Sequence, residues 1–356
     1  MLKHIGIGLV AAIIIAIAGF FVWRAMAQSA IEKARYINPD TGIVVAENVI
    51  IGGIEQAITI RGHDPSAPVL LALHGGPGSA QMALSHLFQT GWERDFIVVE
   101  WDQRGAGKTR IPNADYDALT VDLMYSDAEE MVQHLRARFG QDKIFLLGHS
   151  WGSLLGIRLA HEHPGWFHAY IGAGQAVDMI ANEAVSYAYA YQAATEAGDD
   201  KALKQLQAIG APPYPSDRVF ASLMTEREVL MAMGGSITGN SLSPLIKAVL
   251  TSPDYSFGDV LHYSNALELS IDALLEEMLT MDVREMGMTF ELPLFFMLGR
   301  HDNIVPSSLA ETYITQITAP SIETIWFENS RHFPMISEPE KFTTILRQQV
   351  RPLAGD

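Results

Sequence analysis

Short apolar runs recur along the chain from residue 43 onward, and polar or glycine-containing stretches separate them. Two β-rich runs, Ile43–Ile51 and Ile54–Ile60, flank Gly52-Gly53, and this combination predicts a hairpin. Later runs are short and almost wholly apolar, as strands buried on both faces are: Val69–Leu73, Phe96–Trp101, Ile144–Leu147, Ala169–Gly172, Leu294–Leu298 and Ile322–Phe327. Helix-like stretches lie between several of them: Ala118–Phe139, Trp151–Glu162 and Ser307–Gln316. This alternation predicts an α/β fold with a mostly parallel, doubly wound sheet and an antiparallel edge.

The pattern changes from about Gln175 to Met288, where helix-like windows dominate and no central strand is expected. The windows are Val177–Ala197, Lys201–Ile209, Asp217–Met233 and Asn265–Leu279. We interpret this interval as a helical cap inserted between two strands, over the carboxyl edge of the sheet. The predicted organisation is a hydrophobic segment (1–27), a linker (28–42), the first part of the core (43–174), the cap (175–288) and the second part of the core (289–356).

The N-terminal segment is apolar or small without interruption from Ile5 to Trp23. A membrane-spanning helix needs roughly 20 such residues, whereas the apolar region of a cleavable signal has about 7–15. We therefore expect a retained membrane anchor. Because the tail before it is very short and a large domain follows, we expect that domain to lie outside the cytoplasmic membrane. Ala25-Met26-Ala27 also fits a signal-peptidase site, so a secreted or periplasmic protein released by cleavage is the alternative.

Composition narrows the classes of function. The chain has 356 residues and no cysteine, which excludes disulfides, thiolate metal sites and thiol nucleophiles. It has 24 Lys and Arg against 41 Asp and Glu, a formal net charge of −17. Because nucleic-acid binding depends on neutralising phosphates, we expect no nucleic-acid partner.

The pentapeptide Gly148-His149-Ser150-Trp151-Gly152 lies between a predicted strand and a predicted helix. In an open α/β sheet, ligands bind outside the carboxyl ends of the strands. A G-x-S-x-G turn at this position holds its serine in a strained conformation with the hydroxyl exposed, and the following helix directs N–H groups toward it. Ser150 is therefore the predicted nucleophile; the alternative is a serine that caps a helix between two packing glycines.

A serine hydroxyl needs a base to remove its proton, and the base needs an orienting group. Asp302 and His332 each follow a predicted strand, so the chain order is Ser150, Asp302, His332. His332 would act as general base and then general acid, and Asp302 would fix its tautomer. The alternatives are a helix-capping Asp302 and a loop His332, with His301 as a rival base and Asp178 as a rival acid.

Three glycine-containing strips carry a resemblance to a known family. They are His74-Gly75-Gly76-Pro77-Gly78, Asp102-Gln103-Arg104-Gly105-Ala106-Gly107 and the pentapeptide around Ser150. Together they resemble the α/β-hydrolase fold, and more narrowly its proline iminopeptidase branch with HGGPG, DQRGxGxS and G-x-S-W-G. The resemblance runs in element order from about Gly42 to Leu353 and implies the N–H groups of Gly76 and Trp151 as oxyanion donors. It also implies Ser150, Asp302 and His332 as the catalytic set, and no metal or organic cofactor.

The second strip continues into Gly107-Lys108-Thr109, which imitates the end of a phosphate-binding loop. The full pattern needs a glycine five positions before Gly107, but Asp102 stands there and would repel a phosphate. We therefore reject a nucleotide site and expect Asp102 and Arg104 to tie loops together, with Lys108 and Thr109 incidental.

The cap departs from the iminopeptidase pattern, because its start reads Gly174-Gln175-Ala176-Val177-Asp178 rather than Arg-Gly-Ile-Phe. Glu183 is the candidate acceptor for a substrate amine; the alternative is a solvated glutamate on a helix face. The leading hypothesis is a serine hydrolase of iminopeptidase or aminopeptidase type that acts on small molecules or short peptides through an acyl-enzyme. The alternatives are an esterase or lactonase with the same residues and, remotely, an inactive membrane-tethered binding protein.

Overall fold

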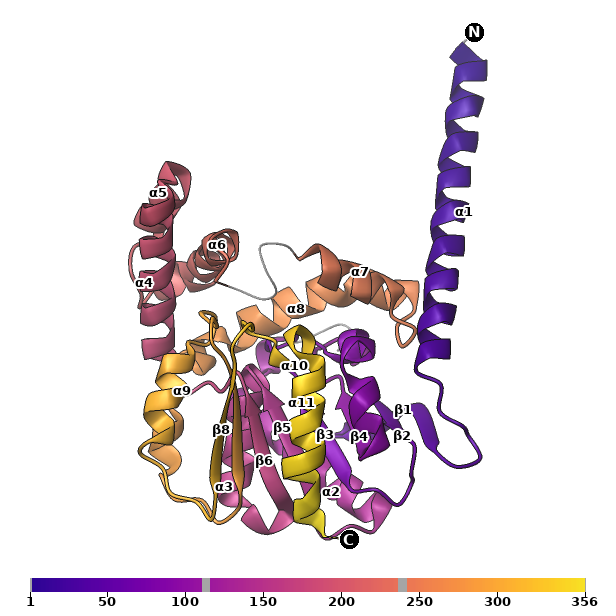
Figure 1. Ribbon diagram of the computed structural model, residues 1–356. Coiled ribbons are helices and arrows are strands. Elements are labelled where there is room, and N and C mark those ends of the chain that lie inside the picture. Colours follow the sequence, from indigo (N-terminus) through magenta and orange to yellow (C-terminus); the bar gives the residue numbers. More distant parts are fainter. Residues whose placement is uncertain (1, 111–115, 236–241, 356) are drawn as a thin grey trace.

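The computed structural model describes residues 2–110, 116–235 and 242–355, which form one sheet of eight strands in the order β1-β2-β4-β3-β5-β6-β7-β8 (Figure 1). The strands are β1 (Ile43–Ile51), β2 (Ile54–Gly62), β3 (Val69–Leu73), β4 (Ile97–Trp101), β5 (Ile144–His149), β6 (Phe167–Ala173), β7 (Leu294–Gly299) and β8 (Ile322–Phe327). β1 pairs with β2 and β2 with β4 in antiparallel fashion, and the other neighbours are parallel. The predicted fold, a mostly parallel sheet with an antiparallel hairpin at its edge, is confirmed.

Alternate residues of the central strands pack against different layers of helices. Leu71 and Leu73 of β3 belong to the cluster that contains residues of α2 (Val121–Phe139), α3 (Trp151–Glu162) and α9 (Ser307–Ile314). Leu70 belongs to the cluster on the other face, which contains residues of α11 (Pro339–Ile345). The sheet is therefore covered on both faces, and this explains why its strands read as continuous apolar runs.

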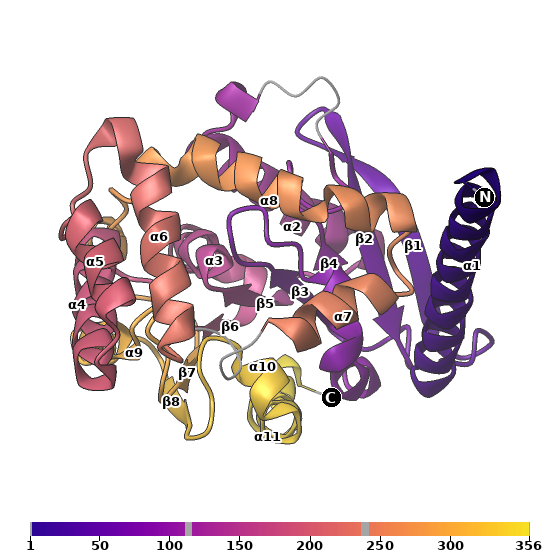
Figure 2. The same ribbon diagram turned by 90° about the horizontal axis from the view of Figure 1, so that it is seen from above.

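Between β6 and β7 the described residues form five α-helices that lie over the carboxyl edge of the sheet (Figures 1 and 2). They are α4 (Met179–Ala197), α5 (Asp200–Ile209), α6 (Val219–Ala232), α7 (Ser243–Thr251) and α8 (Phe257–Met278). Our expected helix at Asn265–Leu279 was too short, because a capping box between Ser256 and Asp259 starts α8 two turns earlier. α7 was missed altogether.

The N-terminal helix α1 (Leu2–Ala34) extends beyond the body of the protein (Figure 1). Its stretch Leu9–Ala34 is long and apolar enough to cross a membrane, and only 6% of its most apolar window is buried.

Candidate active site

Ser150 lies in the sharp turn between β5 and α3. Its φ of 55° and ψ of −121° make it the one non-glycine residue with positive φ in the described part of the chain. The Ser150 N–H donates to Ala173 O at 3.1 Å, and Ser153 Oγ donates to Ser150 O at 2.6 Å. A methyl group added at Gly152 would lie 2.2 Å from Leu73 O, so only glycine allows this helix to approach β3. Strain of this kind costs about 1–3 kcal/mol and tends to occur at functional sites.

Asp302 and His332 are hydrogen-bonded to each other at the same edge of the sheet. His332 Nδ1 lies 2.8 Å from Asp302 Oδ2, and both residues are buried. The other carboxylate oxygen, Oδ1, accepts the N–H groups of Ile304 and Val305, each at 3.0 Å. Because an ionised carboxylate only accepts hydrogen bonds, His332 carries its proton on Nδ1, which leaves Nε2 as the basic nitrogen.

Gly75 lies against Ser150, and Gly174 lies against the pair of Asp302 and His332. A methyl group added at Gly75 would lie 3.1 Å from Ser150 Cβ, and one added at Gly174 would lie 3.3 Å from His332 Nδ1 and 3.4 Å from Asp302 Oδ2. Gly174 directly follows Ala173, whose carbonyl accepts the Ser150 N–H. Within residues 2–110, 116–235 and 242–355, no hydrogen bond joins the Ser150 hydroxyl to His332. Bonds of this kind often form fully only when substrate is bound.

His149 fixes the backbone of His332, a role that our sequence reasoning missed. Its Nε2 donates to His332 O at 2.8 Å, its Nδ1 accepts from the Gln81 amide at 2.5 Å, and the two imidazole rings are 4.8 Å apart. Burial, and to a smaller extent the neighbouring His332, lowers the pKa of His149 well below its usual value, so this ring is neutral. Its position beside Ser150 in the G-x-S-x-G strip was the available signal.

The rival acid and base do not join the pair. Asp178 accepts the Ala181 N–H at 2.9 Å as the N-cap of α4 and forms an ion pair with Arg284. His301 is exposed, and across the described residues its side chain has no hydrogen bond with Asp302.

The other two strips interlock beneath Ser150. His74 Nδ1 donates to Gly75 O at 2.7 Å, and its Nε2 accepts the Gln103 N–H at 3.1 Å. Burial lowers the pKa of His74 to about 4, so the ring stays neutral in this role. The Gln103 amide donates to His74 O at 3.2 Å and accepts the Trp151 indole N–H at 3.2 Å. Gln103 thus links the loop that contains Gly76 to the first residue of α3.

The Asp102–Thr109 strip ties loops together, as expected, but Thr109 is not incidental. Arg104 forms a bidentate pair with buried Asp127 at 2.7 and 3.0 Å, and Asp102 Oδ2 accepts from Lys108 N and Tyr255 Oη at 2.8 and 2.6 Å. Thr109 is buried; its hydroxyl donates to Asp102 O at 2.5 Å and accepts the Ala57 N–H at 2.8 Å. The expectation for Thr109 was wrong because a short polar side chain can bridge backbone groups that no local pattern brings together.

A cavity of about 140 Å³ lies between Ser150 and the cap. Gly76, Ser150 and Trp151 line its floor, and Glu183, Asn182 and Arg227 are the polar residues of the cap that line it. Trp151 is the first residue of α3, where backbone N–H groups have no partner within the helix. The remaining walls are mostly apolar: Leu154, Ala176, Met179, Leu223, Met224, Ile271, Met278, Ile304 and Val305.

Glu183 is buried, so the alternative of a solvated helix-face glutamate was wrong. Both of its carboxylate oxygens accept from Arg227 Nη2 at 2.7 Å, and Arg227 Nη1 donates to Glu226 at 2.9 Å. Glu226 is also buried and accepts from Tyr214 Oη at 2.7 Å. Burial, and to a smaller extent repulsion by Glu183, raises the pKa of Glu226 to about 7. The cluster of Glu183, Arg227 and Glu226 therefore has two carboxylates for one guanidinium.

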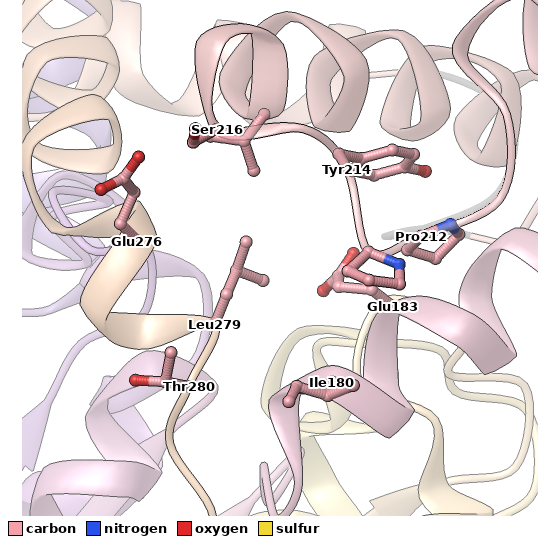
Figure 3. Close-up of a pocket in the computed structure, with 10 residues that line it drawn as sticks. Ile180, Glu183, Pro212, Tyr214, Ser216, Glu276, Leu279 and Thr280 are labelled. Carbon is pink, nitrogen blue, oxygen red and sulfur yellow. The ribbon is translucent and has the colours of Figure 1, made fainter.

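A second cavity, of about 270 Å³, is also lined by Glu183 (Figure 3). Its lining is mostly apolar and includes Ile180, Pro212, Tyr214 and Leu279. Glu183 and Glu276 lie on opposite sides of the space in Figure 3. Glu183 is thus shared by both cavities.

One group of side chains within the described residues has metal-ligand chemistry, but it is far from Ser150. Glu129, Glu162 and His163 bring ligand atoms within 4.8 Å of one another. They lie at the opposite end of α3, about 18 Å from its start at 1.5 Å per residue. Each of these three side chains already has a hydrogen-bond partner. His163 bonds to Glu129, and Glu162 accepts hydrogen bonds from Tyr125 and Arg158.

Comparisons with known proteins identify the family of this chain. A family model described as serine aminopeptidase, S33, matches residues 64–233. The probable aminopeptidase YbaC from Bacillus subtilis (strain 168) is 32% identical over 315 residues, which cover 87% of this chain and 97% of that protein.

Two solved structures share the fold. The proline iminopeptidase-related protein TTHA1809 from Thermus thermophilus has a TM-score of 0.62 at 20% identity, over 87% of this chain and 98% of its own. The esterase RhEst1 from Rhodococcus sp. ECU1013 has a TM-score of 0.57 at 18% identity, over 87% of this chain and 99% of its own.

Proposed function

Because this chain belongs to the α/β-hydrolase superfamily, among proteins related to aminopeptidases and proline iminopeptidases, and is a hydrolase, we propose that it acts through Ser150, His332 and Asp302 on small substrates with a free amine. The observation that carries the catalytic assignment is the strained Ser150 beside the hydrogen-bonded pair of His332 and Asp302.

In the proposed reaction, His332 Nε2 takes the Ser150 proton as the hydroxyl attacks the scissile carbonyl. The negative charge on the carbonyl oxygen would be stabilised by the N–H groups of Gly76 and Trp151, whose residues line the cavity beside Ser150. His332 then protonates the leaving amine or alcohol, and water hydrolyses the acyl-enzyme by the same steps. Asp302 holds the imidazole and stabilises its protonated form.

The preference for a free amine rests on charge in the cap. When Glu226 is ionised, the cluster of Glu183, Arg227 and Glu226 has a net charge of −1, and Glu183 lines the cavity above Ser150. A carboxylate with little water around it forms a charge-assisted hydrogen bond with an ammonium group, worth about 1.5–3 kcal/mol. Since Arg227 already pairs with Glu183, the amine would join this cluster rather than meet an isolated carboxylate.

An esterase is the second candidate function, and the apolar walls of the cavity are the observation in its favour. Side chains such as Leu223, Met224 and Ile271 would accommodate an acyl chain without any amine. The two candidates share their catalytic residues and differ in the group that the cap recognises.

Matched substrates separate the candidates. We expect aminoacyl arylamides to be hydrolysed with a kcat/KM roughly 10-fold or more above that of their N-acetylated forms, because one charge-assisted bond is lost on acetylation. Short acyl esters preferred over every free-amine arylamide would favour the esterase instead. Ser150→Ala should abolish both activities. Glu183→Ala should raise KM for free-amine arylamides and leave N-acetylated substrates unchanged, whereas Glu276→Gln, a carboxylate of the second cavity outside the cluster, should change neither.

A further inference from the structure

The last turns of α1 are fixed to the cap rather than merely adjacent to it. Arg24 is only 8% exposed, and its guanidinium donates to Leu250 O at 2.8 Å and Tyr255 O at 2.7 Å. Gln28 donates to Ser252 O at 2.7 Å. All three acceptors lie at the corner where α7 leads into α8.

Contacts on both sides of Arg24 extend this attachment. Arg35 forms a bidentate ion pair with Asp254 at 2.7 and 2.8 Å, and both side chains are largely buried. Toward the apolar end, the rings of Phe20 and Phe21 lie 5.6 and 5.1 Å from that of Phe257, the first residue of α8. Residues 20–35 cover about 22 Å of helix, so α1 has a defined direction relative to the cap. Cleavage after Ala27 would remove Arg24 and both phenylalanines from this contact.

The direction of α1 places the cap and the apolar segment on the same side of the protein. In Figure 1, α1 rises beside the cap and extends past it, while the C-terminus lies at the opposite end. Seen from above in Figure 2, α1 is foreshortened at one side of the protein and the cap helices face the viewer. The run Ile5–Trp23 is about 27 Å long at 1.5 Å per residue, which approaches the roughly 30 Å of a bilayer's hydrocarbon core. A membrane crossed by this run would lie over the cap.

Ile246 and Leu261 are the most exposed large apolar side chains of α7 and α8 in the described residues. Ile246 of α7 is 56% exposed and Leu261 of α8 is 62% exposed. They lie opposite the buried side of each helix, which includes Leu245 and Ala248 in α7 and Ala266 and Ser270 in α8. Leu261 is one turn beyond Phe257, the residue that contacts α1, so the exposed apolar residues continue from the anchor onto the cap.

We propose that α1 is a retained membrane anchor that holds the α7–α8 face of the cap against the bilayer, with Ile246 and Leu261 in the lipid interface. The exposed apolar residues of the cap continue from the apolar helix α1, and α1 is fixed to the cap. The partner of this face is therefore a lipid surface. The net charge of −17 disfavours attraction to an anionic surface, so the contact depends on apolar side chains. This goes beyond the proposed hydrolase activity and does not depend on it.

The absence of native cysteines makes a site-specific test possible. Full-length Ile246→Cys, Leu261→Cys and Leu353→Cys variants are labelled with an environment-sensitive fluorophore and reconstituted into phosphatidylcholine vesicles. Leu353 is the control, because it is an exposed apolar residue near the C-terminus, at the end of the protein away from the cap. Nitroxide-labelled lipids should quench the probes at 246 and 261 and leave the probe at 353 unchanged.

Equal quenching at all three positions, none at 246 and 261, or failure of the protein to float with the vesicles would overturn the proposal. Adding Arg24→Ala to Ile246→Cys should reduce quenching at 246 while the protein still floats; unchanged quenching would refute the fixed attachment. Turnover of a soluble substrate is measured on the same samples. A loss of turnover without a change in quenching would count against the catalytic assignment only, and a loss of quenching without a change in turnover would count against the membrane proposal only.

Discussion

Asp302→Asn removes one charge and leaves the fold of its loop in place. The amide oxygen can still accept the N–H groups of Ile304 and Val305, which now bond to Asp302 Oδ1 at 3.0 Å. The amide NH2 would then point at His332 Nδ1, 2.8 Å from the present Oδ2, and make that nitrogen an acceptor. The proton moves to Nε2, so His332 can no longer accept one from Ser150.

The expected loss follows from this change of tautomer. We predict that kcat/KM falls by about 10⁴, or roughly 5 kcal/mol of transition-state stabilisation, at a cost in folding stability of about 1–2 kcal/mol. Rates are measured with the substrate that the wild type turns over best, beside urea unfolding curves. Asp178→Asn is the matched control and should keep near-normal activity, because that carboxylate caps α4 and pairs with Arg284. A folded Asp302→Asn variant with more than a tenth of wild-type activity would refute the assignment of Asp302.

Three further predictions concern the cap and the buried polar groups. As pH rises through about 7, Glu226 loses its proton and its cluster gains negative charge, so KM for free-amine arylamides should fall while KM for N-acetylated substrates stays flat; parallel profiles would contradict this. Burial, and to a smaller extent repulsion by Asp102, raises the pKa of Glu100 well above its usual value. The folded state therefore keeps this proton while the unfolded chain releases it, and the free energy of unfolding falls as pH rises above the ordinary glutamate pKa. Thermal unfolding should therefore show a smaller loss of Tm between about pH 5 and 8 in Glu100→Gln than in the wild type. Thr109→Val should cost about 1–3 kcal/mol in urea unfolding, against less than about 0.5 for the neighbouring Lys108→Ala; equal costs would make Thr109 incidental after all.

The sequence was most informative where local pattern and element order coincide. The central strands could be read from runs such as Val69–Leu73 because strands covered on both faces must be apolar throughout. The turn at Ser150 could be predicted because glycines on both sides of a serine, between a strand and a helix, have a specific conformational use. Asp302 and His332 stood out because each follows a strand, and parallel strands bring their carboxyl ends to one edge.

Long-range pairing in the cap could not be predicted in this way. Glu183 and Arg227 are 44 residues apart on α4 and α6, and nothing in either helix indicates that burial will force them to pair. The same holds for Thr109, whose partner Ala57 is 52 residues away. The start of α8, in contrast, could have been predicted from the sequence, since Ser256 and Asp259 have the spacing of a capping box.

The identity of the nucleophile is the claim on which the proposed chemistry depends. A fluorophosphonate probe, which reacts with activated serines, is incubated with the full-length protein and the adduct is located by peptide mass spectrometry. We predict a single adduct on Ser150, within Gly148-His149-Ser150-Trp151-Gly152, and none in Ser150→Ala. An adduct on another residue, or labelling that persists in a folded Ser150→Ala variant, would contradict the account.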